Sequence, residues 1–307
     1  MSRVIDQRVS LSYASPPSLW KSYATLLWSR KPTFVAEGGS SSPIEAHLSR
    51  FRVNRAHVAR YRAICGGPDS NDLPLTYPHV LSMPLHMALM TSPAFPVRII
   101  GLIHTANHIV QRRPLRMNDV GDMSVQFDGH RDAYRGQEFV LRSDVRVGGE
   151  IIWTEACTYF ARAPRGTKPS GVRPRKVVIP DPPAEPRPAE FRDVPIAVAE
   201  NTGRRYACAS GDFNPIHLWP ATSKLFGFEK PMAHGFWSLA RCAAEVHEET
   251  SRRPCELDAV FRYPVVLPSK TRLQVWPGED GLNLSLFDGN ADKLHLYAKL
   301  AFTGTPL

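Results

Sequence analysis

Apolar residues recur along the chain with two different periods, and the same order of elements occurs twice. In the first half, runs rich in Val, Ile, Thr and aromatic residues follow a helical pattern and predict strands. In the second half we expect a helix over about Ala197–Ser210, a long helix after His234, and strands between Leu257 and Phe302. The strands predicted in the first half are Ile99–Val110, Asp119–Asp128, Glu138–Val147 and Glu150–Ala161.

The helix predicted after His234 carries a single apolar stripe. Apolar residues fall at positions i, i+3, i+4, i+7 and i+10, which share one face of an α-helix. We therefore expect this face to be buried. Its residues are Phe236, Leu239, Ala240, Ala243 and Val246.

Three short patterns occur in the same order in both halves and predict an internal duplication. The first is a tyrosine five residues before a glycine, the second a proline-led segment ending in histidine, and the third an Arg- and Pro-containing segment beside predicted strands. The pairs are Tyr61–Gly66 with Tyr206–Gly211, Pro84–His86 with Pro231–His234, and Gln111–Leu115 with Phe261–Val265.

Composition divides the chain into four parts. The first 45 or so residues hold a helix candidate at Leu19–Trp28 and a breaker at Gly38–Pro43, which is typical of an extension. Many of the 28 prolines gather between Pro164 and Pro188, which indicates a linker. We therefore expect an extension over 1–45, a module over 46–163, a linker over 164–188 and a second module over 189–307.

The formal charge of +9 favours anionic ligands such as nucleic acid or phosphorylated small molecules. Basic residues are spread along the whole chain, and no five like charges occur in a row. A nucleic-acid partner is therefore not expected, and the phosphates of a CoA-type ligand would fit the charge equally well.

The five cysteines include no Cys-x-x-Cys pair, which argues against a zinc spacing and against a dense disulfide framework. The N-terminus lacks the apolar stretch of a signal peptide, and no apolar run approaches the roughly 20 residues of a membrane span. We expect reduced thiols, no membrane span and a cytoplasmic location.

The segment Ser210–His217 holds the strongest candidate chemistry. Asp212 and His217 lie five residues apart, with Asn214 and Pro215 between them. Pro215 lacks a backbone donor and biases Asn214 away from helix, so the segment is predicted to be a shaped loop. A carboxylate and a neutral imidazole near one water can exchange a proton, as the addition of water to a conjugated double bond requires.

His234 and Gly235 stand just before the long predicted helix. Glycine lets a ligand approach the backbone closely, and the first N–H groups of a helix have no acceptor within it. Such donors could hold the oxygen of a thioester carbonyl as it becomes enolate-like. The first half has Gly66-Gly67 where the second has Gly211-Asp212, so we expect one site per chain.

Tyr206 to Gly235, with its SGDFNPIH and AHGF segments, resembles the signature of the MaoC-like (R)-specific enoyl-CoA hydratases. The resemblance extends more loosely over about residues 46–307, as the double-hotdog form of that family. It implies an α+β fold of two fused hotdog modules, each a long helix held by an antiparallel sheet, with only the C-terminal module catalytic.

By this resemblance Asp212 and His217 form the catalytic pair, Asn214 orders the loop, and the Gly235 N–H is the oxyanion donor beside His234. The family converts trans-2-enoyl thioesters of CoA or a carrier protein reversibly to (R)-3-hydroxyacyl thioesters, without metal or redox cofactor. A homodimer is a further expectation. Several single-hotdog members carry a serine where this chain has Ala243, so the surroundings of the site differ from theirs.

Other interpretations of the same residues stay open. An Asp-x-Asn run is by itself often a turn, and only the longer match with His234-Gly235 favours catalysis. A metal site of Asp212, His217 and His234 lacks any supporting His-x-x-x-His or cysteine pair. An acyl-CoA thioesterase or a non-catalytic acyl-thioester-binding module would also suit a hotdog fold. The first-half histidines are expected in the core or an interface: His79, His86, His104 and His108.

Overall fold

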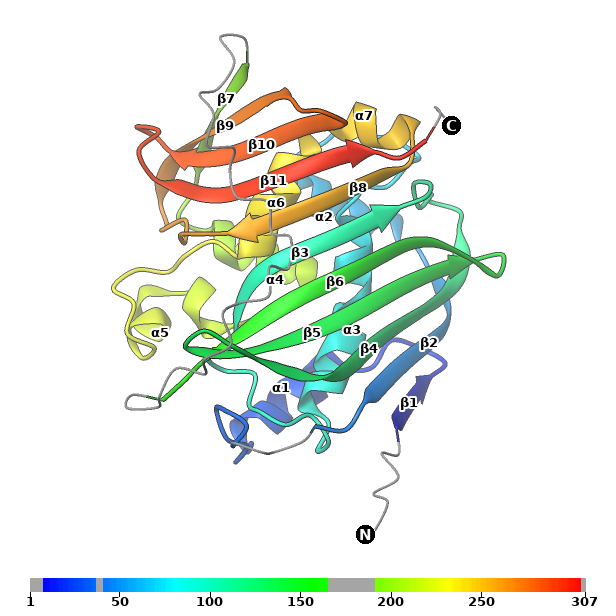
Figure 1. The fold of residues 1–307 in the computed structure, drawn as a ribbon, viewed down its shortest axis with the longest axis vertical. Helices are drawn as coiled ribbons and strands as arrows, with labels where there is room; N and C mark the ends of the chain where they lie inside the picture. The colour runs from blue at the N-terminus through cyan, green and yellow to red at the C-terminus, as the bar shows by residue number, and fades with distance from the viewer. Residues whose placement is uncertain (1–7, 37–40, 165–190, 305–307) are drawn as a thin grey trace. The chain divides into compact units, whose positions relative to one another are not determined.

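The computed structural model describes residues 8–36, 41–164 and 191–304, and the chain divides into two units (Figure 1). The first unit contains Met1–Arg52, Ser82–Thr105 and Val120–Val177, and the second contains Val53–Leu81, Ala106–Asp119 and Val178–Leu307. The second unit draws on both halves of the sequence, whereas the first contains no residue beyond Val177. The boundary between the units crosses helix α3 (Tyr77–Thr91) and strand β3 (Ile103–Gln111).

The predicted modules 46–163 and 189–307 stay a prediction, since the two units are defined by contacts and the second takes in segments of the first half, Val53–Leu81 and Ala106–Asp119. The linker predicted over 164–188 lies outside the described residues, apart from residue 164.

The first unit is built on a five-stranded sheet with helix α1 (Leu19–Leu27). Its strand order is β1-β2-β4-β5-β6, and all neighbours are antiparallel except the parallel pair β1 and β2. Side chains along β4 and β5 alternate between buried and more exposed positions, as expected of strands with one face on a core. The strands are β1 (Val9–Tyr13), β2 (Ile44–Arg52), β4 (Val120–Ala133), β5 (Gly136–Val147) and β6 (Glu150–Arg162).

Strand β1 and the first residues of β2 lie within the extension predicted over 1–45. Strand β1 pairs in parallel with β2, which begins at Ile44, before the module boundary predicted at residue 46. Burial alternates along the first residues of β2, as expected of a strand with one face on a core. Ile44, Ala46 and Leu48 are buried, while their neighbours are more exposed. The predicted helix at Leu19–Trp28 is confirmed as α1, within one residue.

The second unit is built on an antiparallel sheet with the strand order β3-β8-β11-β10-β9-β7, to which β3 contributes residues 106–111. Its strands are β7 (Arg192–Val198), β8 (Cys255–Phe261), β9 (Ser269–Pro277), β10 (Gly281–Asp288) and β11 (Leu294–Phe302). Its helical elements, besides the start of α3, are α2 (Arg55–Cys65), α4 (Thr202–Ser210), η1 (Pro215–His217), α5 (Pro220–Lys224), α6 (Gly235–Ala244) and α7 (His247–Arg252).

The apolar stripe predicted after His234 is confirmed. All five of its residues are buried, and α6, which holds all of them except Val246, packs against β10 (Figure 1). The Nε1 of Trp237, on the same helix, donates a hydrogen bond of 2.9 Å to the backbone carbonyl of Ile64 at the end of α2. Helix α6 is therefore fixed both to the sheet and to α2.

The helix predicted over Ala197–Ser210 is shorter than expected. Its first residues belong to β7, which pairs antiparallel with β9, and α4 begins only at Thr202. The β-branched residues Val194, Ile196 and Val198 alternate along this stretch and favour the strand, so pairing with β9 decides the conformation.

Two of the three repeated patterns occupy comparable places in the fold. Helices α2 and α4 contact each other and both end at a glycine of positive φ, Gly66 or Gly211, with the Tyr61 and Tyr206 rings 6.4 Å apart. The third pattern likewise begins at the last residues of β3 and β8. The predicted match between Pro84–His86 and Pro231–His234 is wrong, because Pro84 lies inside α3 whereas Pro231 precedes α6.

None of the helices in the described ranges is long and apolar enough to cross a membrane.

Replacing Trp237 by phenylalanine tests the tie between α6 and α2. The change leaves the buried carbonyl of Ile64 without its donor, and we expect the free energy of unfolding to fall by about 1–3 kcal/mol. Trp28→Phe is the control, because this indole is 85% exposed. Denaturant unfolding measures both, and equal stability of the two variants would show that the hydrogen bond contributes little.

Candidate active site

The loop after α4 is shaped by three bonds between side chains and backbone. Ser210 Oγ accepts the N–H of Asp212 at 3.1 Å, and Asp212 Oδ1 accepts the N–H of Asn214 at 3.1 Å. Asn214 Oδ1 in turn accepts the N–H of Ile216 at 3.4 Å, and this caps the short 3₁₀ helix η1. The polar residues of the motif therefore fix the turn that carries Asp212 and His217.

His217 is tied to the segment that precedes α6. Its Nδ1 lies 2.8 Å from the carbonyl oxygen of Met232. A carbonyl can only accept, so Nδ1 carries the proton and a neutral ring has its lone pair on Nε2. This tautomer is the one a proton acceptor at Nε2 requires.

Helix α4 approaches His217 so closely that only glycine fits at position 203. A Cβ added to Gly203 would lie 2.0 Å from the carbonyl oxygen of His217. The backbone of η1 therefore rests directly on α4, and this contact sets the position of His217.

His234, the residue before α6, completes the cluster. Its Nε2 donates to the carbonyl oxygen of Asp212 at 2.9 Å and lies 3.8 Å from the Asp212 carboxylate. Its ring stacks on His217 with centroids 3.8 Å apart, and the buried Tyr206 ring lies 4.9 Å away on another side. One nitrogen or oxygen atom from each of Asp212, His217 and His234 lies within 4.8 Å of the others.

Burial and charge act in opposite directions on these groups. Burial acts to raise the pKa of Asp212, but the nearby His234 and His217 and the Asn214 N–H hold that pKa below its usual value. Burial lowers the pKa of His217, as does the neighbouring His234, against the opposing effect of Asp212. The arrangement therefore favours a carboxylate beside a neutral imidazole near pH 7.

The pair is open to water at Asp212. The side chain of Asp212 is 34% exposed, whereas His217 and His234 are buried. A carboxylate open to solvent next to a buried imidazole provides a place where one water could contact both groups.

Gly235 is the first residue of α6, so its N–H has no acceptor within the helix. A Cβ at this position would meet the ring of Phe261 at 3.2 Å. Glycine therefore keeps the space between the helix start and β8 narrow. The structure thus brings Asp212, His217, His234 and Gly235 to one place, while the Asn214 side chain orders the loop.

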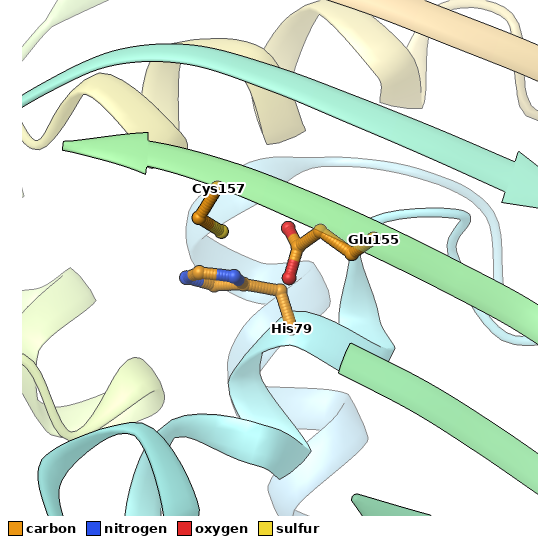
Figure 2. Close-up of side chains that lie close together, drawn as sticks. All are labelled: His79, Glu155 and Cys157. Atoms are coloured by element: carbon orange, nitrogen blue, oxygen red, sulfur yellow. The ribbon is translucent and has the colours of Figure 1, made fainter. Parts of the chain in front are cut away.

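Sequence reasoning missed His79 as a neighbour of this site. It lies on α3 (Figure 2), is buried, and stacks on Phe236 with ring centroids 3.6 Å apart. Its electrostatic effect also acts to lower the pKa of Asp212. No local motif surrounds His79; the only signal is a histidine in an apolar helix, which is typical of core positions. Ala243 is buried on α6, as its place in the stripe predicts.

The three clustered side chains could each offer one ligand atom to a metal ion. Two of their nitrogens are already committed, because His217 Nδ1 bonds to Met232 and His234 Nε2 bonds to the Asp212 carbonyl. The expectation that the site works without metal stays a prediction.

Fold and site together define an α+β protein with an Asp–His pair facing the start of a buried helix. Residues 183–284 match the family model of the MaoC like domain. The chain is 36% identical over 244 residues to 3-hydroxyacyl-thioester dehydratase X of Mycobacterium tuberculosis. The aligned region covers 78% of this chain and 82% of that protein. The chain therefore belongs to the MaoC-like dehydratase family, and its predicted place among the hydro-lyases is confirmed.

Solved structures agree with this assignment. The crystal structure of HtdX of Mycobacterium tuberculosis matches with a TM-score of 0.69 and 31% identity, over 84% of this chain and 100% of that one. Another M. tuberculosis protein, described as having a double hotdog fold, matches with a TM-score of 0.51 at 12% identity, over 82% and 93% of the two chains. The predicted α+β double-hotdog fold is confirmed.

Gly203→Ala should displace His217 without touching any ionisable group. The added methyl group collides with the His217 carbonyl, so we expect a loss of about 1–3 kcal/mol in the free energy of unfolding. Cys208→Ala, on the exposed side of the same helix, is the control. Thermal unfolding measures both, and a Gly203→Ala protein as stable as the control would mean that η1 can move away freely.

The depressed pKa of His217 predicts a pH-dependent stability. The unfolded chain binds a proton at this residue near pH 6.5, whereas the folded chain does so only at lower pH. Stability should therefore fall as the pH drops below about 6.5, and His217→Asn should reduce this loss by about 1 kcal/mol between pH 7.5 and 5.5. Unfolding curves at both pH values measure it; identical pH dependence in the two proteins would contradict the buried neutral ring.

Proposed function

We propose that the chain catalyses the reversible hydration of trans-2-enoyl thioesters to (R)-3-hydroxyacyl thioesters at one site in its C-terminal half. The observation that carries this proposal is the juxtaposition of Asp212 and the Nδ1-protonated His217 beside the start of α6. Membership of the MaoC-like family supports the reaction class, and the name of the relative, a 3-hydroxyacyl-thioester dehydratase, supports the substrate class. The acyl group would be carried by CoA or by a carrier protein.

In the proposed mechanism, Asp212 and His217 Nε2 hold one water between them. The water oxygen bonds to C3 of the enoyl group as the C2–C3 double bond becomes a single bond. One proton of that water passes through the Asp212–His217 pair to C2, on the same face. The same steps in reverse remove water from the hydroxyacyl thioester.

During this step negative charge develops on the thioester carbonyl oxygen. The N–H of Gly235, at the positive end of α6, is directed at such an oxygen in this proposal. His234 acts as a positioning residue, because its Nε2–H holds the Asp212 carbonyl and its ring stacks on His217. No metal or redox cofactor takes part in this chemistry.

Asp212→Asn and His217→Asn should each reduce hydration of crotonyl-CoA by at least about 10²-fold, since each removes one partner in the proton transfer. Asparagine at position 217 keeps a side-chain N–H for the Met232 carbonyl but lacks Nε2. Loss of the enoyl absorbance measures the rate. Matched controls are Asp292→Asn, an exposed aspartate, and His47→Asn, whose ring bonds to the carbonyl of Met123.

Turnover unchanged in both site variants would reject the proposed pair. Thiol release measured in the same samples distinguishes a thioesterase, which frees CoA without consuming the double bond. Binding of many acyl lengths with no turnover would instead indicate a binding module.

In this proposal the configuration at C3 depends on which face of the double bond the water held by Asp212 and His217 attacks, and the family resemblance predicts the (R) product. A panel of trans-2-enoyl-CoA chain lengths, each followed by chiral analysis of the product, should yield the (R)-3-hydroxyacyl thioester throughout. Formation of the (S) product would contradict the proposed arrangement of Asp212, His217 and Gly235.

A further inference from the structure

The first unit contains a groove that the hydratase proposal does not use. It lies between the end of α1, the segment that follows it to Lys31, and residues from the end of α3 to Ile99. Its volume is about 720 Å³, within the range of roughly 300–1,000 Å³ that is typical of small-molecule sites. Leu26, Met90 and Ile99 give it an apolar lining.

Positive charge gathers at this groove. Arg30, Lys31 and Arg98 line it, and Arg98 also lines an adjoining hollow of about 220 Å³ together with Arg162. The lining residues of both cavities include no aspartate or glutamate, and within the described ranges none of the four cations forms an ion pair. Clustered cations without acidic neighbours favour an anionic ligand.

Lys31 has a structural role within this cluster. Its Nζ donates to the carbonyl oxygens of Met90 and Ser92 at the end of α3, and burial lowers its pKa to about 8. The ammonium offsets the partial negative charge of the helix end, which would otherwise repel an anion. Arg30 and Arg98, both exposed, keep their guanidinium groups available.

Trp28 adds apolar surface at the edge of the groove. It is the C-cap of α1, lines the groove, and is 85% exposed. A large indole in solvent beside an apolar groove is typical of a surface that a ligand covers.

We propose that this groove binds an amphipathic anion, with an aliphatic chain along Leu26, Met90 and Ile99 and a terminal oxyanion on Arg30 and Arg98. The oxyanion could be the carboxylate of a fatty acid or the phosphate of an alkyl ester, since guanidinium groups bind both. The proposal is independent of the hydratase reaction, because every lining residue belongs to the first unit and Asp212 and His217 belong to the second.

Calorimetric titration of the full chain with dodecanoate, dodecyl phosphate and dodecanol, each below its micellar concentration, tests the proposal. Both anions should bind, and the one with the higher affinity identifies the preferred head group, carboxylate or phosphate. Dodecanol should bind at least about tenfold more weakly than either anion. Trp28 emission should shift to shorter wavelength as the chain covers the indole, and Trp28→Phe should lose that shift while the calorimetric signal persists.

The double variant Arg30→Gln/Arg98→Gln should weaken binding of the anions at least about tenfold and leave turnover of crotonyl-CoA unchanged. The control Arg252→Gln/Lys270→Gln removes two exposed cations of the second unit and should bind as wild type does. Asp212→Asn should also keep full affinity, which separates this groove from the catalytic site.

Three results would overturn the proposal: no binding by the wild-type chain, equal affinity for dodecanol and dodecanoate, or unchanged affinity in Arg30→Gln/Arg98→Gln. Loss of binding in Asp212→Asn would likewise overturn it, because the ligand would then occupy the catalytic site.

Discussion

The hydrogen bond from His217 Nδ1 to the carbonyl of Met232 is the interaction on which the candidate site depends. It joins the loop after α4, which carries Asp212 and His217, to the segment before α6, which leads to Gly235. It also fixes the tautomer, since a proton on Nδ1 leaves Nε2 as the acceptor of a neutral ring. Together with the bond from His234 Nε2 to the Asp212 carbonyl, it holds Asp212 and Gly235 in one geometry.

Neighbouring residues hold His217 and the Asp212 backbone in place. Gly203 lets η1 rest on α4, and His234 holds the Asp212 backbone while stacking on His217. Burial keeps both imidazoles uncharged, so the Asp212 carboxylate is the one site group expected to be ionised near neutral pH. Packing and electrostatics thus select one protonation pattern, which is the pattern that transfer of a proton from water requires.

Much of this could be predicted from local sequence. The Asp–His loop, the apolar stripe of α6 and most strands follow from short-range patterns, which local physics determines. What could not be predicted depends on distant partners: β1 and β7 are short strands whose conformation pairing decides, and His79 reaches the site only by stacking on Phe236. Pro84 misled the comparison of the halves, because a proline before a helix and one inside a helix look alike in sequence.

The proposed proton transfer requires that His217 is a neutral ring with its proton on Nδ1. Nitrogen-15 NMR of histidine-labelled protein tests it directly, with His217→Asn to assign the resonances. At pH 7 we expect a protonated Nδ1 and an unprotonated Nε2 for His217. A ring protonated on Nε2 alone, or on both nitrogens, would contradict it.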